Sequence, residues 1–97
     1  MLNTTDIYRY KLFTDPGHGW FEVSMNELRE LGIQNKISTF SYFDPETDHA
    51  YLEEDCDAGV LYHALKDRGL KFETVTTPDC VTDDSFIRSL PRYPQHR

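Results

Sequence analysis

Acidic side chains are concentrated in one stretch of this 97-residue chain, residues 44–57. The stretch contains seven acids and no lysine or arginine: Asp44, Glu46, Asp48, Glu53, Glu54, Asp55 and Asp57. Because the whole chain has 17 acids and 10 bases, its net charge of −7 equals the charge of this stretch alone. Charge concentrated in this way creates a directional field that attracts a positively charged partner and repels nucleic acid. We therefore expect these seven residues to bind a partner. The alternative interpretation is a solvated hairpin turn beside the start of a helix.

The residues that could hold a metal or perform catalysis lack the required spacing. The four histidines, which do not follow a zinc-binding pattern, are His18, His49, His63 and His96. The acidic stretch lacks the central glycine and the ligand register of an EF-hand loop. Cys56 and His63 are seven residues apart on one predicted helix, about 10 Å by helical rise, which is too far for a nucleophile and its base. We expect no catalytic residue, no metal ligand and no cofactor, and thus a protein that is not an enzyme.

Direct nucleic-acid binding is also disfavoured, because lysine and arginine are neither in excess nor clustered. The opposite role is compatible with the composition. B-DNA carries about one charge per 1.7 Å of its axis, and carboxylates on one face of a strand recur about every 6.7 Å. An acidic protein of this kind can occupy the arginine- and lysine-rich surface that a partner uses for DNA.

Two strands and a helix are predicted in the first third of the chain. Residues 7–13 and 20–23 are rich in aromatic and β-branched residues, and residues 15–19 between them contain the proline and glycines of a turn. Ser24 and Glu27 then match a capping box, which predicts a helix near residues 25–31. Gly32 follows at the usual helix stop and is expected to have a positive φ.

The acidic stretch is predicted to lie in a second strand pair and at the start of a second helix. Residues 37–43 give a strong strand signal, residues 44–48 a turn, and residues 50–53 a returning strand. Asp55 or Asp57 is expected to cap the following helix, which Gly69 ends. Residues 70–75 alternate as a last strand.

These elements predict one α+β domain, residues 1–97, with the order β-β-α-β-β-α-β. We expect two helices on one face of a mostly antiparallel sheet and an irregular C-terminal tail from about residue 76. No apolar run approaches the roughly 20 residues of a membrane span, and the N-terminus lacks the pattern of a signal peptide. These features favour a cytosolic protein.

Several segments resemble a known group of small acidic proteins carried by phages and plasmids. The segments, which together contain 24 of the 97 residues, are residues 18–23, 28–33, 36–38, 41–42 and 51–57. The chain resembles in particular the type I-F anti-CRISPR proteins of the DNA-mimicking kind. The resemblance implies a non-enzymatic inhibitor in the host cytoplasm that blocks DNA capture by the CRISPR surveillance complex. It implies a partner site at the Cas8f/Cas5f end of that complex, with no direct contact to nucleic acid or membrane.

Two alternatives remain open. One is a DNA mimic directed against a restriction enzyme or a DNA-binding regulator. The other, from a different class, is a small enzyme or metal-binding module that uses His49 and its acidic neighbours. Ionic strength distinguishes both DNA-mimic hypotheses from the enzyme or metal-binding module, because salt screens the exposed charge pairs on which a mimic depends.

Overall fold

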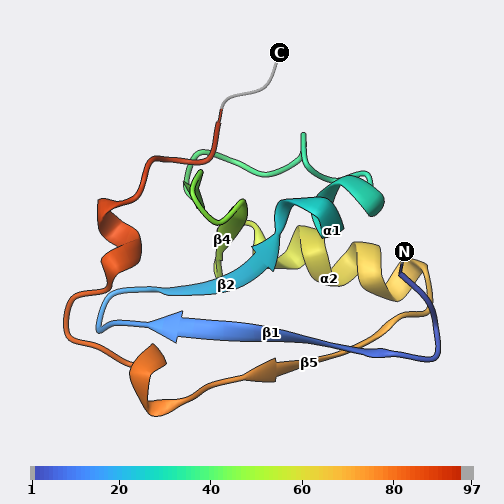
Figure 1. Ribbon diagram of the computed structural model, residues 1–97, viewed down its shortest axis with the longest axis horizontal. Helices are drawn as coiled ribbons and strands as arrows, with labels where there is room; N and C mark the ends of the chain where they lie inside the picture. The colour runs from blue at the N-terminus through green and yellow to red at the C-terminus, as the bar shows by residue number, and fades with distance from the viewer. Residues whose placement is uncertain (1, 95–97) are drawn as a thin grey trace.

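The computed structural model describes residues 2–94, in which strand pairs alternate with helices (Figure 1). The elements are β1 (Ile7–Thr14), β2 (Gly19–Ser24), α1 (Met25–Glu30), β3 (Tyr42–Asp44), β4 (His49–Glu53), α2 (Ala58–Asp67) and β5 (Lys71–Val75), followed by the 3₁₀ helices η1 (Pro78–Cys80) and η2 (Phe86–Ser89). The predicted α+β class is confirmed. The order of strands and helices agrees with the prediction, although several bounds differ.

The five strands form one mixed sheet with the spatial order β3-β4-β2-β1-β5. Three neighbouring pairs are antiparallel, and β5 lies parallel to β1 at one edge. A parallel neighbour requires a crossover connection. Here β4 and β5 both run parallel to β1, and α2 connects them across one face of the sheet (Figure 1).

The predicted capping of α1 is confirmed. The Ser24 hydroxyl accepts a hydrogen bond from the Glu27 N–H at 3.2 Å, and the helix begins at the next residue, Met25. Gly32 has φ 71°, the left-handed conformation expected just after a helix end. Val23 and Leu28, on either side of the cap, are both buried in the same apolar cluster.

The strand predicted over residues 37–43 is mostly wrong, because only Tyr42–Asp44 forms β3. Residues 37–41 form a loop with a turn at Thr39 and Phe40. Ile37 is buried in the core, and the hydroxyls of Ser38 and Ser41 donate hydrogen bonds to Asp57 instead of facing solvent from a strand. Serine side chains that bind a distant carboxylate hold the backbone in a loop even where the local composition favours a strand.

The prediction that Asp55 or Asp57 caps α2 is also wrong. Asp57 occupies the position before the helix, but its carboxylate makes no capping hydrogen bond to the helix. Gly69 ends the helix with φ 67°, as predicted.

Within the described residues, no helix is long and apolar enough to cross a membrane.

The two faces of the sheet are covered differently. Both helices pack on one face, where Leu28 of α1 and Leu61 of α2 join Phe21 and Leu52 in the main core. This arrangement confirms the predicted placement of the helices. On the opposite face a smaller cluster contains Trp20, Tyr42, Tyr51 and Ile87, of which Ile87 belongs to η2.

The C-terminal segment, residues 76–94, contributes Ile87 and Leu90 to this smaller cluster and so covers one end of the second face (Figure 1). It contains two 3₁₀ helices where the sequence predicted only irregular chain. Tyr42 bridges to Arg92, and the Phe43 N–H donates to the Pro91 carbonyl at 2.9 Å, so this segment also lies along the free edge of β3.

Candidate functional site

The structure divides the exposed acids of the stretch between the two ends of β4. The turn acids are Asp44, the last residue of β3, with Glu46 and Asp48 of the β3–β4 turn. The helix-start acids, Glu54 and Asp55, follow the other end of β4. Six residue steps separate Asp48 from Glu54, about 20 Å at roughly 3.3 Å per residue. Residues adjacent in sequence thus form two negative clusters rather than one patch.

The turn acids differ in how strongly the protein engages them. Asp44 is half-buried and accepts a hydrogen bond from the Glu46 N–H at 3.0 Å, which stabilises the turn. Asp48 has φ 58°, and its carboxylate lies 3.6 Å from the Arg29 guanidinium. Both side chains of that ion pair are about half exposed, so solvent screens it. Glu46 is fully on the surface.

The helix-start acids lie against the β1–β2 turn. The Glu54 N–H donates to the Gly19 carbonyl at 3.0 Å, and a Cβ at Gly19 would meet the Glu54 carboxylate at 2.7 Å. The glycine therefore allows this acid to lie close to the backbone of β2. Both Glu54 and Asp55 are exposed.

Two acids predicted to bind the partner, Glu53 and Asp57, are buried, with exposed fractions of 6% and 3%. Asp57 accepts hydrogen bonds from the Ser38 N–H at 3.1 Å, from the Ser38 hydroxyl at 2.8 Å and from the Ser41 hydroxyl. Its function in this structure is to tie the loop before β3 to the start of α2. The outer acidic surface is consequently formed by the five exposed or half-buried acids.

A hollow of about 420 Å³ lies between the second face of the sheet and the C-terminal segment. We call it the aromatic hollow. Its aromatic walls are Trp20, Phe40 and Tyr42. Its other lining residues are His18, Glu53, Asp55, Cys56, Arg88 and Arg92. No sequence pattern groups these residues, because they come from four separate parts of the chain.

Cys56 in this hollow is poorly suited to nucleophilic catalysis. A hydrogen bond to Glu53, with further contributions from desolvation and the neighbouring carboxylates, raises the pKa of the exposed Cys56 thiol. The reactive form of cysteine is the thiolate, which a raised pKa disfavours. His18 approaches the same carboxylate, with its Nδ1 3.6 Å from Glu53 Oε1.

Asp15 attaches the C-terminal segment to the β1–β2 turn. Its side chain, only 2% exposed, accepts hydrogen bonds from Arg88 Nε at 2.6 Å and from Arg88 Nη2 at 2.8 Å. The N–H groups of Gly17, His18 and Ser85 also donate to it. The Arg88 guanidinium is the main reason that the pKa of Asp15 lies well below its ordinary range. The sequence signal was weak: an aspartate before Pro-Gly predicts a turn, and nothing local indicates an arginine 73 residues away.

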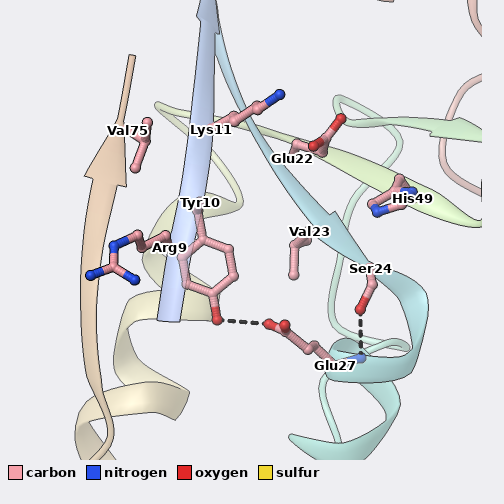
Figure 2. Close-up of a pocket in the computed structure, with 9 residues that line it drawn as sticks. All are labelled: Arg9, Tyr10, Lys11, Glu22, Val23, Ser24, Glu27, His49 and Val75. Atoms are coloured by element: carbon pink, nitrogen blue, oxygen red, sulfur yellow. Dashed lines mark hydrogen bonds between the residues drawn. The ribbon is translucent and has the colours of Figure 1, made fainter. Parts of the chain in front are cut away.

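A second hollow, about 380 Å³, forms where β1 and β2 part (Figure 2). The two strands pair only at Leu12↔Phe21, Phe13↔Trp20 and Thr14↔Gly19. The next three pairs of the same register line the hollow instead: Arg9, Tyr10, Lys11, Glu22, Val23 and Ser24. Figure 2 shows the strands diverging and the Tyr10 ring between them.

The floor of this second hollow is closed by an internal hydrogen bond. The Tyr10 hydroxyl donates to Glu27 Oε2 at 2.7 Å, and burial raises the pKa of Tyr10 above its ordinary value. At one wall Arg9 pairs with Glu73 of β5 at 2.6 Å. Arg9, Tyr10 and Ser24 in the lining thus form hydrogen bonds within the protein.

Among the described residues, no group of three or more histidine, cysteine, aspartate or glutamate side chains is arranged to hold a metal ion. His49 lies opposite Asp44 in the β3–β4 ladder, yet these two residues have no third partner of that kind. His96 lies outside the described residues. The metal-binding alternative therefore receives no geometric support from residues 2–94.

Comparison with models of known protein families, with curated proteins and with solved structures finds no match for this chain.

Proposed function

We propose that this protein is a non-enzymatic inhibitor whose acidic surface occupies the DNA-binding site of a partner, the type I-F CRISPR surveillance complex. The observation that supports this proposal best is the pair of exposed negative clusters at the two ends of β4, about 20 Å apart. Their charge is not balanced by the rest of the chain, because the chain as a whole has a net charge of −7.

The spacing suits a surface built to hold DNA. One turn of B-DNA is about 34 Å long, so a basic groove that follows little more than half a turn is long enough to contact both clusters. Each exposed ion pair contributes only about 0–1 kcal/mol. Several pairs acting together, with long-range steering, give useful affinity and fast association at low salt.

The direct experiment measures capture of target DNA by the purified surveillance complex in the presence of this protein. We expect inhibition that weakens steeply as the salt concentration rises, because ions screen exposed charges. The triple variant Glu46→Gln, Asp48→Asn, Glu54→Gln should inhibit about 5- to 150-fold less, from the loss of about 1–3 kcal/mol.

A matched control removes three exposed acids elsewhere: Asp67→Asn, Asp83→Asn and Asp84→Asn. This control reduces the net negative charge by the same three units as the first triple variant. It should inhibit as the unmodified protein does. Equal loss in both triple variants would show that only net charge matters. The protein could instead leave DNA capture unaffected and block a restriction enzyme or a DNA-binding regulator. That result would contradict the proposed partner and support DNA mimicry.

A further inference from the structure

The Glu53 carboxylate in the aromatic hollow is buried without a fully charged partner. Its side chain is 8% exposed and accepts a bifurcated hydrogen bond from the Asp55 N–H at 3.1 and 3.2 Å. Within residues 2–94 no lysine or arginine approaches it within 4 Å, and the nearest basic group is the His18 imidazole at 3.6 Å, charged only if protonated. Burying a carboxylate in this way is costly unless a cation is supplied.

The aromatic walls of the hollow already hold flat cations. The Arg88 guanidinium carbon lies 5.2 Å from the centre of the Trp20 ring, and that of Arg92 lies 4.6 Å from the centre of the Tyr42 ring. Both distances are within the range of cation–π attraction. The third wall, Phe40, has its side chain 62% exposed at the mouth.

The charges of the hollow leave room for one more cation. Arg88 is paired with Asp15, which does not line the hollow, so its charge is offset from outside. Glu53 and Asp55 then face Arg92 alone, which leaves a net charge of about −1 when His18 is neutral. The volume, about 420 Å³, is at the lower end of ordinary ligand pockets and suits a side chain better than a folded segment.

We propose that the aromatic hollow binds the guanidinium group of an arginine side chain from the protein partner. The flat group would stack on Phe40 while its forked N–H donors pair with the Glu53 carboxylate. Arginine fits better than lysine, because an ammonium is a point charge that neither stacks nor forms two parallel hydrogen bonds. This inference rests on the proposed function, since DNA-binding surfaces present arginines, and it assigns one of them a defined anchor site.

The test uses N-acetyl-L-arginine amide as the probe and the single tryptophan, Trp20, as the fluorescent reporter, with NMR shifts of the lining residues as a second readout. We expect saturable binding by the arginine compound and weaker binding by N-acetyl-L-lysine amide. Glu53→Gln, which keeps the shape and removes the charge, should weaken binding at least about tenfold. The matched control, Asp67→Asn, changes an exposed acid of α2 outside the hollow and should leave binding unchanged.

Phe40→Ala provides a second variant if Glu53→Gln does not fold, because Phe40 is largely exposed. It should also weaken binding. The proposal is overturned if the arginine compound does not saturate, if both Glu53→Gln and Phe40→Ala bind it as the unmodified protein does, or if neutral guanosine binds equally well.

The two proposals fail separately. Arginine binding without any effect on DNA capture would remove the proposed function and leave the hollow as a guanidinium site. Salt-sensitive inhibition without arginine binding would remove this inference alone.

Discussion

Acids of one sequence stretch have two different environments in this fold. Glu46 and Asp55 lie on the surface, whereas Glu53 and Asp57, within a few residues of them, are buried and hydrogen-bonded. The comparison shows that a count of acids overstates the charge available to a partner. It also divides the stretch by physical role, because the buried Asp57 holds the fold together and the exposed acids create the external field.

The two environments differ in what removal of a carboxylate should cost. Removal of a buried acceptor leaves its hydrogen-bond donors without partners, which lowers the free energy of unfolding by about 1–3 kcal/mol for each donor group. Substitution of an exposed carboxylate that makes no such contacts changes the free energy of unfolding by about 0.5 kcal/mol or less. Stability and binding measurements on the same variants therefore test the comparison directly.

The largest effect is expected for Asp57→Ala. The variant leaves the hydroxyls of Ser38 and Ser41 and one backbone N–H without their acceptor, so the free energy of unfolding should fall by about 3 kcal/mol or more. Urea denaturation followed by Trp20 fluorescence measures it. A loss below about 1 kcal/mol would mean that this buried acid is no more structural than a surface one.

A smaller effect, visible in the pH dependence, is expected for Asp15→Asn. Because the native pKa of Asp15 is lowered, its stabilising contribution is complete above its ordinary pKa near 3.9 and is lost as the pH falls below that value. The melting temperature of the unmodified protein should therefore fall steeply below about pH 4, and that of Asp15→Asn should be lower at pH 7 and flatter in acid. Asp83→Asn, at an exposed acid, is the control, and a parallel acid slope in Asp15→Asn would contradict the assignment.

The smallest effect on stability is expected for the exposed triple variant Glu46→Gln, Asp48→Asn, Glu54→Gln. Each substitution should change the free energy of unfolding by no more than about 0.5 kcal/mol, since these side chains make few internal contacts. The same urea titration applies. Marked destabilisation would show that the turn acids and Glu54 are also structural, and the comparison between the two environments would no longer hold.

The local features of the fold were readable from the sequence. Ser24 and Gly32 set the bounds of α1, Gly69 ends α2, and the first strand pair follows from its composition and turn. Each of these signals acts over a few residues through backbone conformation or a nearby hydrogen bond, so the chain needs no distant partner to express it.

The tertiary structure alone decided which acids face solvent and which segment covers the second face of the sheet. Asp57 is buried because Ser38 and Ser41, 19 and 16 residues away, supply donors for it, and these contacts also convert most of the predicted strand over residues 37–43 into a loop. The 73-residue link between Asp15 and Arg88 likewise has no local signal. Sequence spacing determines local backbone conformation, whereas burial depends on which distant groups the completed fold brings within hydrogen-bonding distance.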